Sequence, residues 1–393
     1  MTGAAAADIV PISDADRALP AARRGLSGVY LRPEALGAIE SDWRDLARDA
    51  VEQNPFYSPW MLRPALARLP SGGVKVACVF EGGRLAGLVP LAPMQGYARL
   101  PVRYLATWMH EHCFYAAPLV RRGCEEVFFK SLFRLADAHP ARPAFLRLRH
   151  IDADGPLVRA ARNVAEDAGR LSFLSGAFER ALLKGGYCAD DYLAKTIRKK
   201  KRKEMTRLRR RLEETGPVVM QTLDDARDIG RWRDDFLALE RAGWKGREGS
   251  ALAASQASAG FFGETLDRAF AAKALRFYRL EVGGRAIAMI VNFLAGEEGY
   301  SFKIAHDPDF ARFSPGVMLE IEMLKALENE QGLRFVDSCA SADHRMINSL
   351  WADRRSITGL NISGPRRRDR VLLGACAALE GARERFGAPG ERR

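Results

Sequence analysis

"LRFYRLEVGGRAIAMIVNFLAG", residues 275–296, is the stretch that decides the fold class. Two apolar runs flank Gly283-Gly284, and this arrangement predicts a tight hairpin because glycine accepts the positive φ angles of a primed turn. "VKVACVFEGGRLAGLVPLAP", residues 74–93, has the same design, with Gly82-Gly83 placed 201 residues before Gly283-Gly284. Two unrelated hairpins would give the same local pattern. A spacing of half the chain favours a duplicated domain instead.

The chain length agrees with two domains. At roughly 100–200 residues per domain, 393 residues predict two. We expect a flexible N-terminal tail at 1–25 and an N-terminal domain at 26–185. A C-terminal domain follows at 186–370, with a closing helix and tail at 371–393.

The order of elements in the second half predicts a mixed sheet. Helices are expected at about 224–241 and 258–272, and the hairpin comes next. Then strands at 299–307, 333–340 and 356–363 alternate with helices at 317–330 and 343–353. Strands that begin antiparallel and then alternate with helices indicate an α/β fold of the α+β, mixed-sheet kind.

The composition favours anionic partners and a reducing compartment. The formal net charge is +12 and the sequence pI is about 9.6. Six scattered cysteines without a CxxC pair indicate reduced thiols in a cytoplasmic protein. The N-terminus lacks the features of a signal peptide, and no 18-residue uncharged apolar run predicts a membrane span.

A basic strip precedes the second hairpin. From Lys195 to Arg211, 11 of 17 residues are Lys or Arg. An apolar stripe runs through the same segment, so the sequence predicts one amphipathic helix over 192–214, whose stripe is Leu193, Ile197, Met205, Leu208 and Leu212. The wet face, and a second cluster at Arg366–Arg368 and Arg370, are open to anionic lipid, CoA or RNA.

The strongest local signal for a ligand site is the segment Ser314-Pro315-Gly316-Val317. Ser314 is a natural N-cap, and proline suits the first helical position, where its missing N–H costs nothing. A strand, a short loop and a helix N-terminus form an anion site, and Arg312 lies next to it. An ordinary helix start gives the same string. The segment is neither a Walker motif nor a dinucleotide fingerprint.

These segments together carry a family resemblance. "RAGWKGREGSAL" (241–252), "YSFKIAHDPDFARFSPGVMLE" (300–320) and "VDSCASADHRMINSLW" (336–351) resemble the CelD-type, or BioF2-like, acetyltransferase domain of the GNAT superfamily. The tandem arrangement is similar to the Fem-type peptidyltransferases. The resemblance implies that acyl-CoA lies between two splayed central strands, as a co-substrate and not a tightly bound cofactor. Its pyrophosphate would lie on Arg312–Val317. The first half has no such turn, since "CFYAAPLVRRGCEEVF" (113–128) takes that place.

Four residues are candidates for catalysis. Lys303 and His306 lie on the expected strand 299–307, where Tyr300, Phe302 and Ile304 should share one face and Lys303 the other. Asp337 ends a strand, and His344 follows Asp343, a plausible N-cap. These residues also have plain structural interpretations. Lys303 would then be a solvent-exposed lysine at a strand edge and His306 a structural loop histidine. Cys339, a possible nucleophile, would be a buried thiol.

A second group of residues is expected to contact the acceptor: Trp244, Lys245, Tyr300, Glu111 and His112. The first two lie between glycines after a helix. Alternation in "WMHEHCFY" predicts His110 and His112 on one side of a strand. No further ligands accompany them in the sequence, so no metal site is predicted.

The expected function is acyl-CoA-dependent N-acyl transfer by direct attack of an amine. The acceptor is a lipid amine, as in bacterial ceramide synthases, or a precursor of envelope or exopolysaccharide. A peripheral contact with an anionic inner membrane would suit the former. Two alternatives stay open: an aminoacyl-tRNA-dependent Fem-type peptidyltransferase, and a noncatalytic RNA- or membrane-binding protein on a degenerate scaffold.

Overall fold

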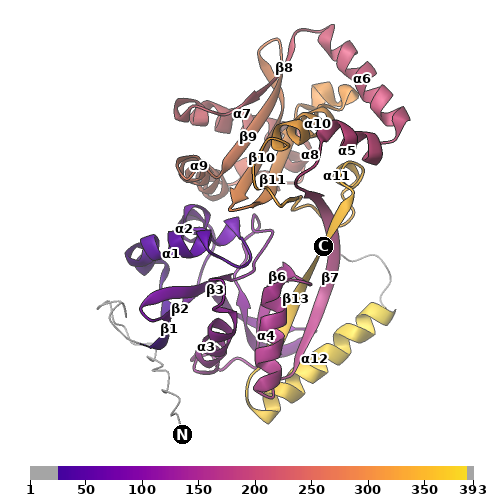
Figure 1. The fold of residues 1–393 in the computed structure, drawn as a ribbon. Helices are drawn as coiled ribbons and strands as arrows, with labels where there is room; N and C mark the ends of the chain where they lie inside the picture. Colours follow the sequence, from indigo (N-terminus) through magenta and orange to yellow (C-terminus); the bar gives the residue numbers. More distant parts are fainter. Residues whose placement is uncertain (1–24, 387–393) are drawn as a thin grey trace. The chain divides into compact units, whose positions relative to one another are not determined.

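The computed structural model describes residues 25–386 of the chain, apart from the side chains of residues 244, 245 and 384–386 (Figure 1). The chain divides into two compact units. Unit 1 holds the residues up to Pro59, Pro70–Phe178 and the chain from Ser356 onward, while unit 2 holds Trp60–Leu69 and Glu179–Arg355. Two segments of the chain belong to a different unit from the one that the sequence predicted. Residues 60–69 belong to unit 2, and the end of the chain returns to unit 1. The predicted tail, 1–25, lies almost wholly outside the described residues.

Unit 1 is built on a sheet in the order β1-β2-β3-β4-β6-β13-β7, with β5 paired to β3. The strands are β1 (Leu26–Leu31), β2 (Lys75–Glu81), β3 (Arg84–Tyr97), β4 (Leu100–Thr107), β5 (Leu119–Val120), β6 (Phe145–Asp152), the first half of β7 (Ser172–Lys184) and most of β13 (Asp353–Ser363). Its helices are α1 (Glu40–Arg48), α3 (Glu125–Asp137), α4 (Pro156–Asp167) and α12 (Arg367–Phe386).

Unit 2 repeats this plan with the sheet order β7-β12-β11-β10-β9-β8. Besides the second half of β7, the strands are β8 (Val218–Thr222), β9 (Leu275–Val282), β10 (Arg285–Ala295), β11 (Glu298–His306) and β12 (Phe335–Asp337). Its helices are α2 (Pro59–Arg68), α5 (Ala189–Thr196), α6 (Lys199–Glu213), α7 (Ile229–Ala242), α8 (Trp244–Arg247), α9 (Gln256–Ala271), α10 (Pro315–Leu327) and α11 (Arg345–Asn348). Helices α7 and α9 cover one face of the sheet, and α5, α6 and α10 cover the other (Figure 1). The predicted mixed α/β fold with two GNAT-like halves is confirmed.

The two Gly-Gly turns are near copies of one another. The φ angles are 58° and 81° at Gly82 and Gly83, and 55° and 82° at Gly283 and Gly284. Both residues of each turn need positive φ, which a side chain would make costly, so glycine is required twice. Each turn joins two consecutive antiparallel strands of its unit, β2–β3 and β9–β10.

Each unit contains one parallel pair of strands, and in both the pairing is brief. In unit 1 the pair β4–β6 matches Leu105 with Leu146 and Ala106 with Arg147. In unit 2 the pair β11–β12 runs from Glu298 opposite Phe335 to Tyr300 opposite Asp337. Beyond Tyr300, β11 continues for six more residues while β12 has ended. The ladder therefore stops after the first third of β11, and the GNAT resemblance expects an opening between these central strands.

The basic segment is two helices and not the single helix predicted over 192–214. Helix α5 ends at Thr196, and Ile197 has φ −99° and ψ 123°, an extended conformation. Helix α6 restarts at Lys199. Neighbouring β-branched residues, Thr196 and Ile197, favour extended backbone and explain the break. All five stripe residues are still buried in one core cluster with α10. Within residues 25–386, no helix combines the length and the apolar character needed to cross a bilayer.

Candidate functional site

The N-terminus of helix α10 combines a left-handed N-cap with a first turn in which Pro315 and Gly316 are buried. Ser314 is the N-cap, at φ 54° and ψ 51°, and its side chain makes no capping hydrogen bond to the residues that the structure describes. Pro315 occupies the first turn, which contains no acidic residue. The predicted cap position is therefore correct, but the hydroxyl does not satisfy the helix amides. The positive end of the helix dipole and its N–H groups suit an anion.

Arg312 and Gly316 flank this N-terminus. The guanidinium of Arg312 is exposed and lies over the ring of Phe313, 4.8 Å from its centroid. A Cβ at Gly316 would meet Ile304 and Met346 at 3.7 Å and the Nδ1 atom of His306 at 4.0 Å. These are ordinary contacts, so the fold does not require glycine here, and close approach of a ligand is a better reason for it.

A β-bulge decides which side chains of β11 meet. Val291 of β10 pairs with Lys303 and Asn292 pairs with Ser301, so Phe302 is one extra residue on β11. The ring of Phe302 lies beside Phe262 of α9. In a bulge two successive side chains leave the same face. The predicted alternation, with Phe302 and Ile304 on one face and Lys303 on the other, is therefore wrong.

Lys303 and His306 both follow the bulge and are three residues apart, so ordinary alternation puts them on opposite faces of the sheet. Lys303 turns toward α7, where its Nζ atom lies 3.3 Å from Oε1 of Glu240, and both side chains are buried. His306 lies near Gly316, on the side of α10. The two predicted catalytic residues of β11 thus occupy opposite faces of the sheet, and only His306 adjoins the helix N-terminus.

Glu240 is a residue of this region that sequence reasoning missed. Its Oε1 atom pairs with Lys303, and its Oε2 atom accepts a hydrogen bond of 2.7 Å from the backbone N–H of Leu252. Glu240 thereby ties β11 to the end of the segment 243–254. A glutamate inside an amphipathic helix gives no signal in sequence, because only the fold brings Lys303 to it.

Asp337 is held by two guanidiniums and is fully buried. Arg180 donates to it at 2.6 Å and Arg355 at 2.9 Å, while its Oδ1 atom accepts from the backbone N–H of Cys339. Burial alone would raise the pKa of the Asp337 carboxyl, but the two guanidiniums lower it below its ordinary value. A carboxylate stabilised in this way is a poor proton acceptor. The geometry therefore makes Asp337 a structural clamp between three strands and disfavours it as a base.

Tyr300 is buried beside this clamp. Its hydroxyl donates a 2.9 Å hydrogen bond to Glu298. Burial, and then the negative charge of Glu298, raises the pKa of Tyr300 well above its ordinary value. The phenol is therefore a hydrogen-bond donor, and its use in substrate binding stays a prediction.

The helix cap after β12 lies one residue later than expected. His344, and not Asp343, is the N-cap of α11, and its Nδ1 atom accepts a 3.3 Å hydrogen bond from the N–H of Ile347. Asp343 is exposed. A capping imidazole has one nitrogen committed to the backbone, which leaves Nε2 for any acid–base role.

The predicted acceptor residues lie in different units. Trp244 and Lys245 belong to the short helix α8 of unit 2, and their side chains lie outside the described residues. Glu111 and His112 lie in unit 1, in a turn after β4 and not in a strand as predicted. The Nε2 atom of His112 lies 3.2 Å from the carboxylate of Glu111. In the described part of the chain, no group of three or more His, Cys, Asp or Glu is placed to hold a metal ion.

Glu320, one turn after Gly316, is a second residue that the sequence did not single out. It is 2% exposed, and its Oε2 atom makes no hydrogen bond within the described part of the chain. Burial raises the pKa of Glu320 to about 8. A carboxyl group at this position in the apolar core is therefore neutral at pH 7.

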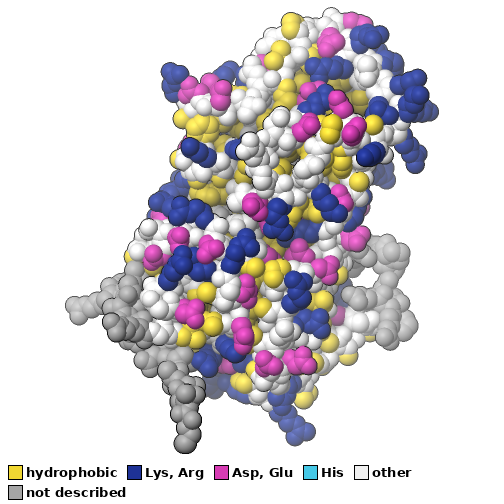
Figure 2. Space-filling view, in the orientation of Figure 1, with side chains coloured by type: hydrophobic (Ala, Val, Ile, Leu, Met, Phe, Trp, Pro, Cys, Tyr) yellow, Lys and Arg dark blue, Asp and Glu magenta, His cyan; other side chains and the backbone are white. Residues whose placement is uncertain are grey.

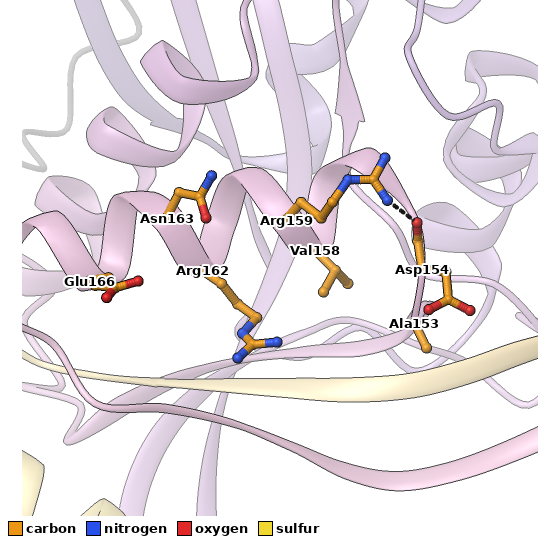
Figure 3. A pocket seen from close by; sticks show the side chains of 7 residues that line it. All are labelled: Ala153, Asp154, Val158, Arg159, Arg162, Asn163 and Glu166. Atoms are coloured by element: carbon orange, nitrogen blue, oxygen red, sulfur yellow. Dashed lines mark hydrogen bonds between the residues drawn. The ribbon is translucent and has the colours of Figure 1, made fainter.

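The surface hollows lie elsewhere. A hollow of about 410 Å³ in unit 1 runs along α4, where Arg159 donates to the backbone oxygen of Asp154 (Figure 3). A hollow of about 700 Å³ in unit 2 lies between α7 and α9, with Arg68 and Arg233 on its rim. Neither includes a predicted site residue. Both carry mixed charges, and neither gathers groups that would select one ligand.

Comparison with known proteins defines the class. A family model described as "Acetyltransferase (GNAT) domain" matches residues 199–344, which span β8 to the start of α11 together with α6. The chain therefore contains a GNAT-type acetyltransferase domain, and the protein is an enzyme of the acyltransferase class. A search of curated protein sequences gave no match.

Two solved structures share the fold of the whole chain. One is FemX, at 10% identity and a TM-score of 0.54, with 88% of this chain and 99% of that chain covered. The other is the C-terminal domain of a putative lysylphosphatidylglycerol synthetase from Agrobacterium fabrum, at 13% identity and a TM-score of 0.51, with 91% and 99% covered. These likenesses establish a fold similar to FemX over both units, in line with the expected tandem GNAT-like arrangement.

Proposed function

We propose that this protein transfers an acyl group from acyl-CoA to an amine. The observation that carries the proposal is the N-terminus of α10. It follows a strand in which only the first three of nine residues pair with the parallel neighbour. Its first turn lacks an acidic residue, and its cap hydroxyl makes no capping hydrogen bond to the described residues. The pyrophosphate of CoA would lie on Ser314–Val317 with Arg312 beside it, and the pantetheine arm would follow β11.

The chemistry needs few groups. The neutral amine attacks the thioester carbonyl, so a C–N bond forms, the C–S bond breaks and CoA leaves as the thiolate. An alkyl amine has a pKa near 10, so a base must remove its proton. His306 is the candidate base nearest the helix N-terminus. Lys303, with its charge held by Glu240, suits the binding of a carbonyl oxygen or an anionic group of the acceptor.

A second donor is favoured by one observation. Helix α6 turns its apolar side into the core and its cations outward, and Figure 2 shows Lys and Arg side chains gathered over that helix. Such a surface suits the phosphates of an aminoacyl-tRNA, the donor of the Fem-type enzymes that the sequence resembles. A lipid amine or an envelope precursor is the acceptor class proposed with acyl-CoA.

The test is a panel of acyl-CoAs of increasing chain length, together with an aminoacyl-tRNA. A donor at 100 times its dissociation constant should stabilise the protein by about 2.7 kcal/mol, read as a rise in Tm. Gly316→Glu places bulk and negative charge at the pyrophosphate and should remove that rise without unfolding the protein. Stabilisation by aminoacyl-tRNA alone, or an unchanged acyl-CoA affinity in Gly316→Glu, would refute the proposed donor or its site.

A further inference from the structure

Helix α12 carries apolar side chains on the face that its own unit does not use. Val371 is 64% exposed, Leu372 38% and Leu379 41%. Three alanines on the same side are also exposed: Ala375, Ala378 and Ala382. Together the six residues recur at three- and four-residue spacings over about three turns. The result is one apolar stripe, here called the α12 stripe, on the surface of a water-facing helix.

A different face of α12 anchors it to unit 1. Leu373 and Cys376 are fully buried and pack on a cluster that includes Tyr104 and Phe145. Asp369, 1% exposed, accepts a hydrogen bond from the backbone N–H of Arg366 and fixes the helix start. The α12 stripe is therefore not needed to hold the helix in place.

The neighbouring strand extends the stripe. Leu171, just before β7, is 37% exposed, and its Cδ2 atom is 3.8 Å from the position that a Cβ would take on Gly374. Such a Cβ would make an ordinary contact, so Leu171 lies beside the helix at this point. The apolar surface thus continues from α12 onto unit 1.

A cluster of cations lies at one end of the stripe. Arg366, Arg367, Arg368 and Arg370 are all exposed at the start of α12. The acidic residue among them, Asp369, is buried. Among the described side chains of 366–383, no Asp or Glu is exposed. The face as a whole is apolar along its length and positive at its beginning.

We propose that this face docks on the surface of an anionic lipid bilayer. Apolar side chains on one side of a helix insert into the boundary between headgroups and acyl chains, and adjacent arginines bind lipid phosphates. A second copy of the chain fits less well, because two such faces would bring their arginines together. Among the described side chains of 366–383, no exposed carboxylate balances them. The proposal is independent of acyl transfer, since it concerns binding without donor or acceptor.

Helix α6 provides the contrast. It carries more cations than α12, but its stripe residues Met205, Leu208 and Leu212 are buried in the core of unit 2. It can attract lipid by charge and cannot insert apolar groups. Removing the same charge from each helix and comparing vesicle binding therefore distinguishes docking by the α12 face from general electrostatic attraction.

The experiment is sedimentation of the full chain with vesicles of phosphatidylcholine, with and without phosphatidylglycerol. Val371→Ser with Leu372→Ser and Leu379→Ser should lower the partition coefficient at least about tenfold. Arg366→Gln with Arg367→Gln should lower binding to the anionic vesicles about thirtyfold. The matched control, Lys200→Gln with Arg207→Gln on α6, removes the same charge and should change binding less than about threefold. All these side chains are exposed, so Tm should stay unchanged.

Four results would overturn the proposal. One is unaltered vesicle binding in the serine variant. Another is a loss in the α6 control as large as that in the α12 arginine variant. The third is a wild-type dimer in gel filtration with light scattering that the serine variant turns into a monomer, because a second copy would then cover the stripe. Tight salt-sensitive RNA binding without vesicle binding counts against it in the same way.

Discussion

The helices that follow the fourth strands of the two units begin in opposite ways. Helix α10 of unit 2 starts with Ser314-Pro315-Gly316 and has no acid in its first turn. Helix α3 of unit 1 starts after Cys124 with Glu125 and Glu126, and the carboxylate of Glu125 accepts a hydrogen bond from the N–H of Gly123. Carboxylates at a helix N-terminus satisfy its dipole and repel phosphate.

This difference shows how a duplicated fold keeps its scaffold and only one candidate donor site. The Gly-Gly hairpins and the brief parallel pairing are retained in both units. The start of the helix after the fourth strand is not retained, and changing it costs little stability. Four predictions test the contrast between the units, from the largest expected effect to the smallest.

The largest effect is expected at the ends of the parallel ladders. Asp337→Asn leaves Arg180 and Arg355 buried without their carboxylate, and should lower the free energy of unfolding by roughly 3–5 kcal/mol. Its counterpart in unit 1, Arg147, lies half-buried over the ring of Tyr97. Arg147→Ala should cost about 1 kcal/mol. Denaturant unfolding measures the loss in free energy of unfolding for each variant. Equal losses in the two variants would contradict the proposed difference between the units.

The second prediction concerns the interiors of the two helices, because α10 buries Glu320 while α3 buries Phe128, Phe129 and Leu132. The raised pKa of Glu320 means that the folded protein keeps a proton that the unfolded chain loses. Stability from this group is present below the unfolded pKa, near 4.5, and is lost as the pH rises to about 8.

Glu320→Gln should therefore match the wild type at pH 5 and be more stable at pH 8, by a few kcal/mol. The measurement is Tm against pH for both proteins. Parallel curves over this range would show that Glu320 is ionised in the folded state.

The third prediction separates fold from ligand at Gly316. An added methyl group meets its neighbours only at 3.7–4.0 Å. Gly316→Ala should keep or raise the stability, by up to about 1 kcal/mol, because alanine favours helix. It should still weaken acyl-CoA binding about tenfold by displacing the donor phosphates. If titration calorimetry shows an unchanged affinity for acyl-CoA, close approach of the donor phosphates does not explain the glycine at 316.

The smallest effect is expected in unit 1. Glu125→Gln with Glu126→Gln removes the charges that favour the start of α3, and should cost about 0.3–1 kcal/mol for each charge. Acyl-CoA affinity should not change, since the donor site is proposed in unit 2. A gain of affinity would show that the acidic residues alone keep CoA from unit 1.

Local patterns predicted much of the fold. The two hairpins, the start of α10 and the burial of Leu193, Met205 and Leu212 each follow from a short stretch of sequence. Short-range rules suffice there, because a turn, a cap or an amphipathic stripe involves residues only a few positions apart.

The candidate site could be predicted from the sequence only in part. The bulge at Phe302 puts Lys303 on the same face as Phe302, toward α7, and no alternation rule reveals an extra residue in a strand. The pairing of Asp337 with Arg180, 157 residues earlier, and of Lys303 with Glu240 depends on contacts between distant elements. These contacts change the roles of the residues, since a carboxylate held by two arginines differs chemically from one at the end of an open strand.

The sequence by itself determined the repeated α/β scaffold, the GNAT-type segment and the position at which helix α10 begins. The tertiary structure alone decided which charges are buried in pairs, where the basic helix breaks, and that the stripe of α12 faces water while that of α6 faces the core. The reason is physical: propensity, turns and caps act over a few residues, whereas burial and charge pairing are properties of the packed chain.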